Sequence, residues 1–185
     1  MIARWAPMIF LSALVAGSIW LVAALSDTQR REIKDERHVA DLYVTGFSTV
    51  VMGEAGRPVR ELRAERLSHF PDTGTKELEQ PHLVIYHPTR PPYHVRSERG
   101  WVSANDDVML LLGEVHIWRD NSAGVREFDL HTTDLRVLPE SQYGETDKRV
   151  VIRTPNSESS GEGMRAYMQQ RRIELLSQVR TVYEK

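Results

Sequence analysis

From residue 41 onward, short apolar and β-branched runs recur along the chain at a nearly constant spacing. Four of them share one signature, an apolar residue followed by a basic and a small one, and begin about 34 residues apart. They are Leu62-Arg63-Ala64, Val95-Arg96-Ser97, Leu130-His131-Thr132 and Met164-Arg165-Ala166. A second β-rich run follows each of them, at 83–86, 115–118, 150–152 and 179–183. A fixed period of this kind indicates stacked units of strands, none of which buries its apolar face alone.

The segments between these runs have the composition of turns. They are rich in Gly, Pro, Asn and Asp, and they lie at 53–58, 71–74, 88–92, 104–107, 120–124 and 156–163. These residues favour tight turns because they tolerate positive φ, fix φ or bond to their own backbone. Strand-sized runs separated by such turns predict an all-β fold: a sandwich, a barrel or a jelly-roll.

The last run gives the clearest assignment of faces. Alternate residues of a strand point to opposite sides, which predicts that Ile173, Leu175, Ser177, Val179, Thr181 and Tyr183 face inward. A helix over 171–178 is the alternative. In the repeated signatures the same alternation directs the central residues, Arg63, Arg96 and His131, to solvent. The small residues beside the apolar ones indicate either ordinary core packing or an interior that admits an apolar ligand.

This last run has a second property. No proline occurs after Pro155, so nothing in the sequence blocks the end of the stack against pairing with another strand. An exposed edge strand can bind a partner through main-chain hydrogen bonds. The run at 172–183 is therefore a candidate docking edge.

The N-terminal region follows a different pattern. Residues 5–25 carry no charge, and as a helix they would span about 32 Å, close to the roughly 30 Å of a bilayer core. The run exceeds the usual signal-peptide core, which favours a retained anchor over a cleaved signal. We expect an anchor helix over 1–26, a charged tether over 27–40 and one β-domain over 41–185. The flanking charges leave the orientation open.

Composition and charge exclude some functions. The net charge is −2, which gives no basic surface for nucleic acid, and the chain has no cysteine and hence no thiol nucleophile, thiolate metal site or disulfide. The seven histidines show neither His-x-His nor His-Glu-x-x-His spacing, so surface or cross-strand roles are expected and no metal site is predicted. No catalytic motif and no cofactor motif is present. The sequence predicts a protein that is not an enzyme.

Three stretches carry a resemblance to a known family. They are Gln80-Pro81-His82-Leu83, then Ser159-Ser160-Gly161 with Met164-Arg165, and finally Glu174-Leu175 with 179–184. In this order and behind an apolar N-terminus they resemble the lipopolysaccharide export protein family LptC. The resemblance implies a single-pass inner-membrane protein with a periplasmic, twisted and slightly open β-jellyroll. It also implies contacts with the transporter LptB, LptF and LptG through the N-terminal edge and the anchor, and with LptA through the C-terminal edge.

Lipopolysaccharide would then bind in an apolar groove of the jellyroll. The residues expected to line it are Phe47, Leu78, Leu83, Ile85, Val95, Trp101, Ile117, Leu130, Met164, Ile173, Leu175, Val179 and Tyr183. Those expected to dock the partner are Gly161, Arg180 and Val182. Two other functions stay open: a glycan- or peptidoglycan-binding sandwich with a row of exposed aromatics (Tyr86, Tyr93, Trp101 and Trp118), and a jelly-roll enzyme with a His/carboxylate cluster.

Overall fold

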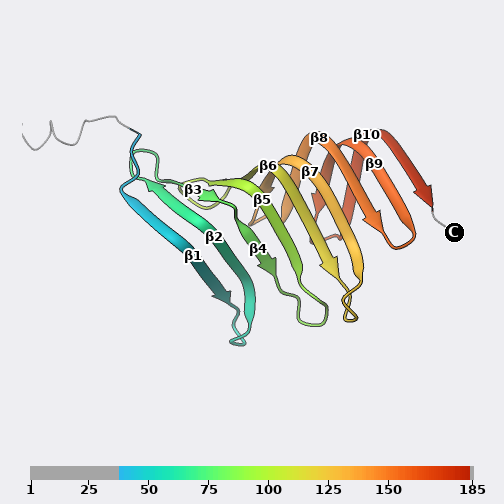
Figure 1. The fold of residues 1–185 in the computed structure, drawn as a ribbon, viewed down its shortest axis with the longest axis horizontal. Coiled ribbons are helices and arrows are strands. Elements are labelled where there is room, and N and C mark those ends of the chain that lie inside the picture. Colours follow the sequence, from blue (N-terminus) through green and yellow to red (C-terminus); the bar gives the residue numbers. More distant parts are fainter. Residues whose placement is uncertain (1–37, 184–185) are drawn as a thin grey trace, which may run out of the picture. The chain divides into compact units, whose positions relative to one another are not determined.

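The computed structural model describes residues 38–183, and ten antiparallel strands account for most of them (Figure 1). The strands are β1 (Leu42–Met52), β2 (Pro58–Phe70), β3 (Thr75–Glu79), β4 (His82–Ile85), β5 (Tyr93–Val102), β6 (Met109–Asp120), β7 (Arg126–Leu138), β8 (Tyr143–Thr154), β9 (Ser157–Tyr167) and β10 (Arg172–Tyr183). The all-β prediction is confirmed, and the helix alternative at 171–178 is wrong because that segment pairs with β9. The expected anchor helix and most of the tether lie outside the described residues. Within 38–183, no helix is long and apolar enough to cross a membrane.

Strand order in the sheet follows the order of the chain. Each strand pairs with the next one, apart from β3 and β4, which lie end to end between β2 and β5 and pair with both of them. These two short strands are two parts of one strand position, interrupted at Gln80-Pro81, where Gln80 has a φ of 48°. Sequential hairpins leave β1 and β10 as the two edges of the sheet.

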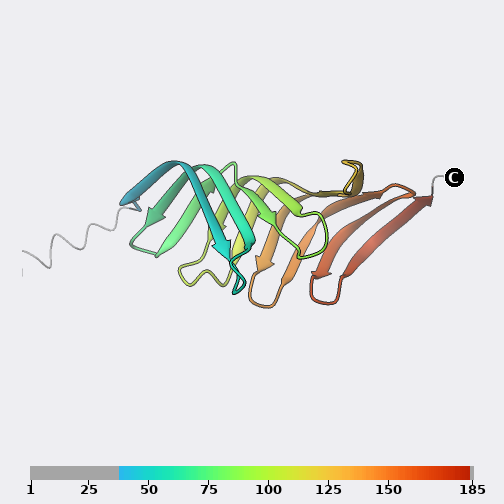
Figure 2. The same cartoon turned by 90° about the horizontal axis from the view of Figure 1, so that it is seen from below.

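A line of irregularities crosses the middle of the sheet. The register shifts between Ser97 and Arg99, and shifts recur at similar heights in the neighbouring pairs β6–β7, β7–β8, β8–β9 and β9–β10. Positive φ angles at Gly113, Asp134 and Gly163 lie on the same line. Bulges bend a strand and increase its twist. The strands consequently bend along their length, and in Figures 1 and 2 the bent halves lie in two layers.

The core lies between these layers. Its larger cluster combines Val95, Val115, Leu130 and Val150 from one side of the bend with Leu111, Leu135 and Met164 from the other. Val150, Val115 and Met164 are the most deeply buried, at 0%, 1% and 1% exposure. A smaller cluster of Ala64, Leu78 and Val102 continues toward β1. We call the face of the sheet that carries these residues the inner face, and the opposite one the outer face.

The repeat detected in the sequence corresponds to every second strand position of this sheet. Leu62, Val95 and Leu130 lie at the same height, linked through Leu83 and Ile117 of the strands between them. The fourth signature is displaced, because Ser159 takes the equivalent position in β9 and Met164 lies beyond the bend. Gly163, whose positive φ of 77° marks the bulge of β9, lies between these two residues.

Candidate functional site

A continuous row of directly opposed residues crosses the inner face from one edge of the sheet to the other. Its members are Thr49, Leu62, Leu83, Val95, Ile117, Leu130, Ile152, Ser159 and Thr181, one from each of nine strands. Opposed residues of paired strands share a face and touch each other. The six central members are all Leu, Ile or Val, and both ends are hydroxyl residues. Ser159 and Thr181 confirm the shared face with a hydrogen bond of 3.0 Å between their side chains.

Exposure along the inner face changes from the middle to the ends. Among the residues predicted to line the interior, four are buried in the core: Leu78, Val95, Leu130 and Met164. Five are partly buried and pack against it: Phe47, Leu83, Ile85, Ile117 and Leu175. The remaining three inward residues are exposed, with Ile173 at 41%, Val179 at 55% and Tyr183 at 78%. The apolar interior is therefore closed in the middle of the sheet and open toward β10.

Trp101 is the exception, because it lies on the outer face. It is opposed to Glu77 and Leu110, whereas its neighbours Gly100 and Val102 are buried on the inner face. The register shift between Ser97 and Arg99 reverses the alternation that began with Val95. The expectation that Trp101 lines the interior is wrong for this reason.

One cation on the inner face was not singled out from the sequence. Arg119 is opposed to Phe128, which packs against the core, and its guanidinium lies 4.6 Å from the centre of the Tyr93 ring. It donates hydrogen bonds to the Tyr93 hydroxyl at 2.6 Å and to Glu127 at 3.0 Å. The alternation of Val115, Ile117 and Arg119 was the available signal. This arrangement puts a charged, aromatic-lined position near one end of the apolar central part of the inner face.

The two edge strands expose apolar side chains. Exposed Leu42, Tyr43, Val50, Val51 and Met52 belong to β1, and exposed Ile173, Leu176, Val179, Val182 and Tyr183 belong to β10. Within the described part of the chain, each of these strands has a hydrogen-bonded neighbour on one side only. Unpaired backbone together with exposed apolar side chains is the usual composition of a site for strand addition.

The residues predicted for partner docking gather at the β10 edge. Arg180 and Val182 are exposed on the outer face of β10, opposed to Ser160 and Glu158. Gly161 is buried in β9, the strand that pairs with β10. A Cβ atom on Gly161 would lie 3.1 Å from the Ser177 carbonyl oxygen and 3.3 Å from the Leu175 Cβ. Gly161 therefore permits the close approach of β10 to β9 and is not itself a surface contact.

The outer face carries a ladder of stacked rings, which we call the histidine ladder: His82, His94, Trp118, His116 and His131. Its ring centres are 5.4 Å apart for His82 and His94, 5.1 Å for His94 and Trp118, and 4.5 Å for His116 and Trp118. The cross-strand role expected for histidines is confirmed for these four. Burial, followed by the nearby Arg96, lowers the pKa of His82; burial also lowers the pKa of His94.

The aromatic row expected of a glycan-binding sandwich does not form. Trp118 is covered by His94 and His116, and Tyr93 packs edge-on against Phe128 on the inner face. Tyr86 donates a hydrogen bond to Glu61 at 2.8 Å, on another strand. None of the four predicted rings, Trp101 included, is fully exposed, and Tyr93 lies on the opposite face from Trp118, so the four do not form the predicted row.

The comparison with protein families agrees with this geometry. The model of the family described as "Lipopolysaccharide-assembly, LptC-related" matches residues 8–184. This chain belongs to the LptC-related family. No curated protein matches the chain.

Membership in the LptC-related family establishes the general role. The family is a non-enzymatic component of lipopolysaccharide transport, so this chain acts in lipopolysaccharide assembly and is not an enzyme. The family also implies lipopolysaccharide binding, partners within the Lpt complex and a location in the cell envelope. The antiparallel ten-stranded sheet is typical of it.

Proposed function

We propose that this LptC-related protein receives lipopolysaccharide from an inner-membrane ABC transporter and passes it to LptA along its inner face. The observation that carries the proposal is the row of opposed inner-face residues, which is apolar over its six central strands and reaches the two edge strands β1 and β10. In this proposal the folded-over sheet is a slightly open β-jellyroll, built as a meander, and its two layers part to form an apolar groove. The core and inner-face residues predicted above would then contact the acyl chains.

The N-terminal half of the proposal concerns the transporter. LptB, LptF and LptG would be engaged at β1 and through an anchor helix over 1–26, with a tether over 27–40 and a periplasmic domain over 41–185. Support comes from the five exposed apolar residues of β1 and from the uncharged run at 5–25. Strand addition at β1 would continue the apolar face from the transporter into this domain.

The C-terminal half concerns LptA. The edge of β10 would pair with LptA, with Arg180 and Val182 beside the junction and Gly161 holding β10 close to β9. The inward residues Ile173, Val179 and Tyr183 are exposed there, where a lipid would leave the domain. Each buried acyl CH₂ contributes about 0.8 kcal/mol, so acyl chains bind to such a face without special chemistry.

Photocrosslinking in cells tests the proposal with a matched pair of positions. Val179 and Val182 lie three residues apart in β10, are similarly exposed at 55% and 47%, and point to the inner and outer face respectively. We expect a photoreactive residue at Val179 to give a lipopolysaccharide adduct, and one at Val182 to give none. No adduct at Val179 with normal protein levels, or equal adducts at both positions, would contradict the proposed path.

A further inference from the structure

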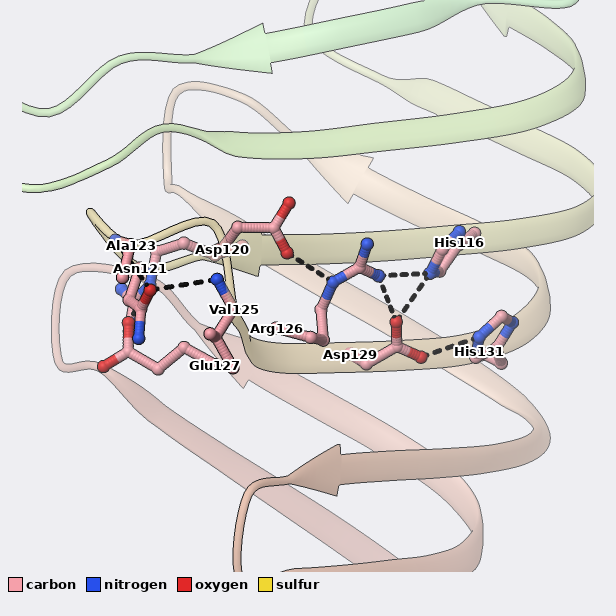
Figure 3. A network of polar contacts seen from close by, with 10 residues as sticks. His116, Asp120, Asn121, Ala123, Val125, Arg126, Glu127, Asp129 and His131 are labelled. Atoms are coloured by element: carbon pink, nitrogen blue, oxygen red, sulfur yellow. Dashed lines mark hydrogen bonds and ion pairs between the residues drawn. The ribbon is translucent and has the colours of Figure 1, made fainter.

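One end of the histidine ladder brings metal-binding groups together across two strands. His116 of β6 is directly opposed to His131 of β7, and Asp129 precedes His131 by two residues on the same face. The Nε2 atom of His116 lies 2.9 Å from Asp129 Oδ2, and that of His131 lies 2.7 Å from Asp129 Oδ1. One ligand atom from each of the three residues lies within 4.8 Å of the other two (Figure 3). The paired backbone of β6 and β7 fixes this arrangement.

We propose that His116, Asp129 and His131 form a binding site for a divalent transition metal ion of the zinc type, with water completing the coordination. Two imidazole nitrogens and one carboxylate are a common zinc ligand set. Magnesium and calcium prefer oxygen ligands and do not match it. A tetrahedral ion with bonds of about 2.0–2.2 Å holds its ligand atoms roughly 3.3 Å apart, so the two hydrogen-bonded distances need to lengthen by only tenths of an ångström.

The rings have room for the adjustment that ligation requires. They stack with centres 4.2 Å apart and planes inclined by 12°, so an ion in the plane of both rings requires them to turn toward each other. The final side-chain torsion of histidine is broad, and the side chains of His116 and His131 are 33% and 49% exposed. Both rings can turn while the backbone ladder stays in place.

Arg126 supplies the positive charge that a metal ion would replace. Its Nη1 atom lies 2.5 Å from Asp129 Oδ2 and 3.5 Å from His116 Nε2, while its Nε donates a hydrogen bond to Asp120 at 2.6 Å (Figure 3). The guanidinium can therefore release Asp129 and keep its ion pair with Asp120. Arg126 and the metal ion thus compete for the Asp129 carboxylate. Removal of Arg126 should affect metal binding at this site but not at histidines elsewhere on the surface.

The site is separate from the apolar path. His116 and His131 alternate with Val115, Ile117 and Leu130, which belong to the inner face. A metal ion bound by these residues joins β6 to β7 on the outer face and touches no lipid-facing side chain. The proposed metal site is therefore independent of the proposed lipid path.

Zinc titration of the full-length protein, purified without a polyhistidine tag, tests the inference. A competing chromogenic chelator reports the affinity, and the visible absorption of Co²⁺ reports the ligand geometry. We expect one Zn²⁺ per chain and no displacement by Mg²⁺. His131→Ala removes a ligand and should weaken binding by more than the roughly 10–100-fold that loss of a group outside the coordination shell costs. Arg126→Gln should strengthen it.

The control is His69→Ala, which removes a half-buried histidine paired with a single carboxylate, that of Asp41, at 2.8 Å. It should leave both the affinity and the Co²⁺ spectrum unchanged. Circular dichroism checks folding, and His116→Ala serves as an independent second ligand variant. Equal zinc affinity in the original protein and both ligand variants, or loss of binding in His69→Ala, would overturn the assignment.

Discussion

At the scale of single residues, alternation along each strand predicts which side chains face solvent. Arg63, Arg96 and His131 are exposed, as the pattern indicates, and the apolar or small residues on either side of each are buried or partly buried. The alternation fails where a bulge adds a residue. Trp101 follows the shift after Ser97 and so faces outward, although counting from Val95 predicts the opposite.

The histidine ladder makes stability depend on pH. The pKa values of His82 and His94 lie below the ordinary value of 6.5, chiefly because of burial. Below pH 6.5 the unfolded chain therefore binds more protons at these two histidines than the folded protein does. The free energy of unfolding should therefore be highest above pH 6.5 and fall as the pH drops below it. Urea unfolding between pH 7.5 and 5.5 measures this fall. Hydrogen bonds and nearby cations hold the pKa values of Glu61, Asp129 and Glu145 below those of free carboxyls, so these groups stay charged in that range.

A variant isolates the contribution of the ladder. His94→Phe keeps a ring against Trp118 but cannot be protonated, so its stability should vary less with pH over this range. The control is His87→Phe, which alters an exposed residue in the turn after β4. The charges that surround the two ladder histidines, and that stay unchanged in both variants, are Glu61, Arg63, Arg96, Asp120 and Arg126. Identical pH profiles for His94→Phe and the original protein would refute this explanation.

At the scale of elements, the bulges determine where the sheet bends and hence which residues form the core. Most strands are recognisable from their β-branched residues and flanking turns, although β9, with the sequence SESSGEGMRAY, is not. The shifts near Gly113, Asp134 and Gly163 are distributed over several strands and act together. They bend the sheet along one line and allow Leu111 and Leu135 to pack with Val115 and Leu130 in a single core.

The fit of β10 against β9 depends on Gly161, which leads to a prediction about this element. Gly161→Arg should displace β10, because even a Cβ atom there lies 3.1 Å from the Ser177 carbonyl oxygen. We expect LptA to bind at least about tenfold more weakly, a loss of roughly 1.4 kcal/mol, while the remaining strands stay folded. A pull-down with purified LptA measures the affinity, and circular dichroism measures the fold.

Milder substitutions separate crowding from the general effect of replacing a glycine in a strand. Gly161→Ala should weaken LptA binding measurably, whereas Gly144→Ala should not, since a Cβ atom at Gly144 meets no atom closer than 3.7 Å. Unchanged LptA affinity in Gly161→Arg would remove Gly161 from the docking assignment.

At the scale of the whole molecule, the two edges of the sheet are eight strand pairings apart, which separates the two proposed docking sites. A change on β10 should therefore leave contacts at β1 intact. Hydrophobic side chains are buried in the middle of the sheet and exposed at both edges. This distribution suits a protein that lies between two partners and continues an apolar face from one to the other.

Ile173→Asp tests this separation. A carboxylate on the exposed inner face of β10 would have to lose water beside acyl chains, so lipopolysaccharide loading should fall severalfold. Copurification with LptB, LptF and LptG should not change. Leu176→Asp is the matched control, because Leu176 is similarly exposed on the same strand, at 46% against 41%, but follows Leu175 onto the outer face. Dissociation of the transporter in Ile173→Asp alone would contradict the independence of the two edges.

The sequence by itself determined the all-β class, five of the six predicted turns and the solvent-facing residues of the repeated signatures, because these depend on local propensity and on alternation within one strand. The turn predicted at 156–163 is wrong: its Gly and Ser residues lie in strand β9, where pairing with β8 and β10 overrides the local preference for a turn. The family resemblance carried by its short stretches also sufficed to predict the LptC-related family. Only the tertiary structure decided which faces the bulges reverse, as at Trp101, and which histidines meet across strands. His116, Asp129 and His131 come together through the register of β6 and β7. Residues that meet across two strands are not separated by a fixed number of positions in the sequence, so no motif reveals them.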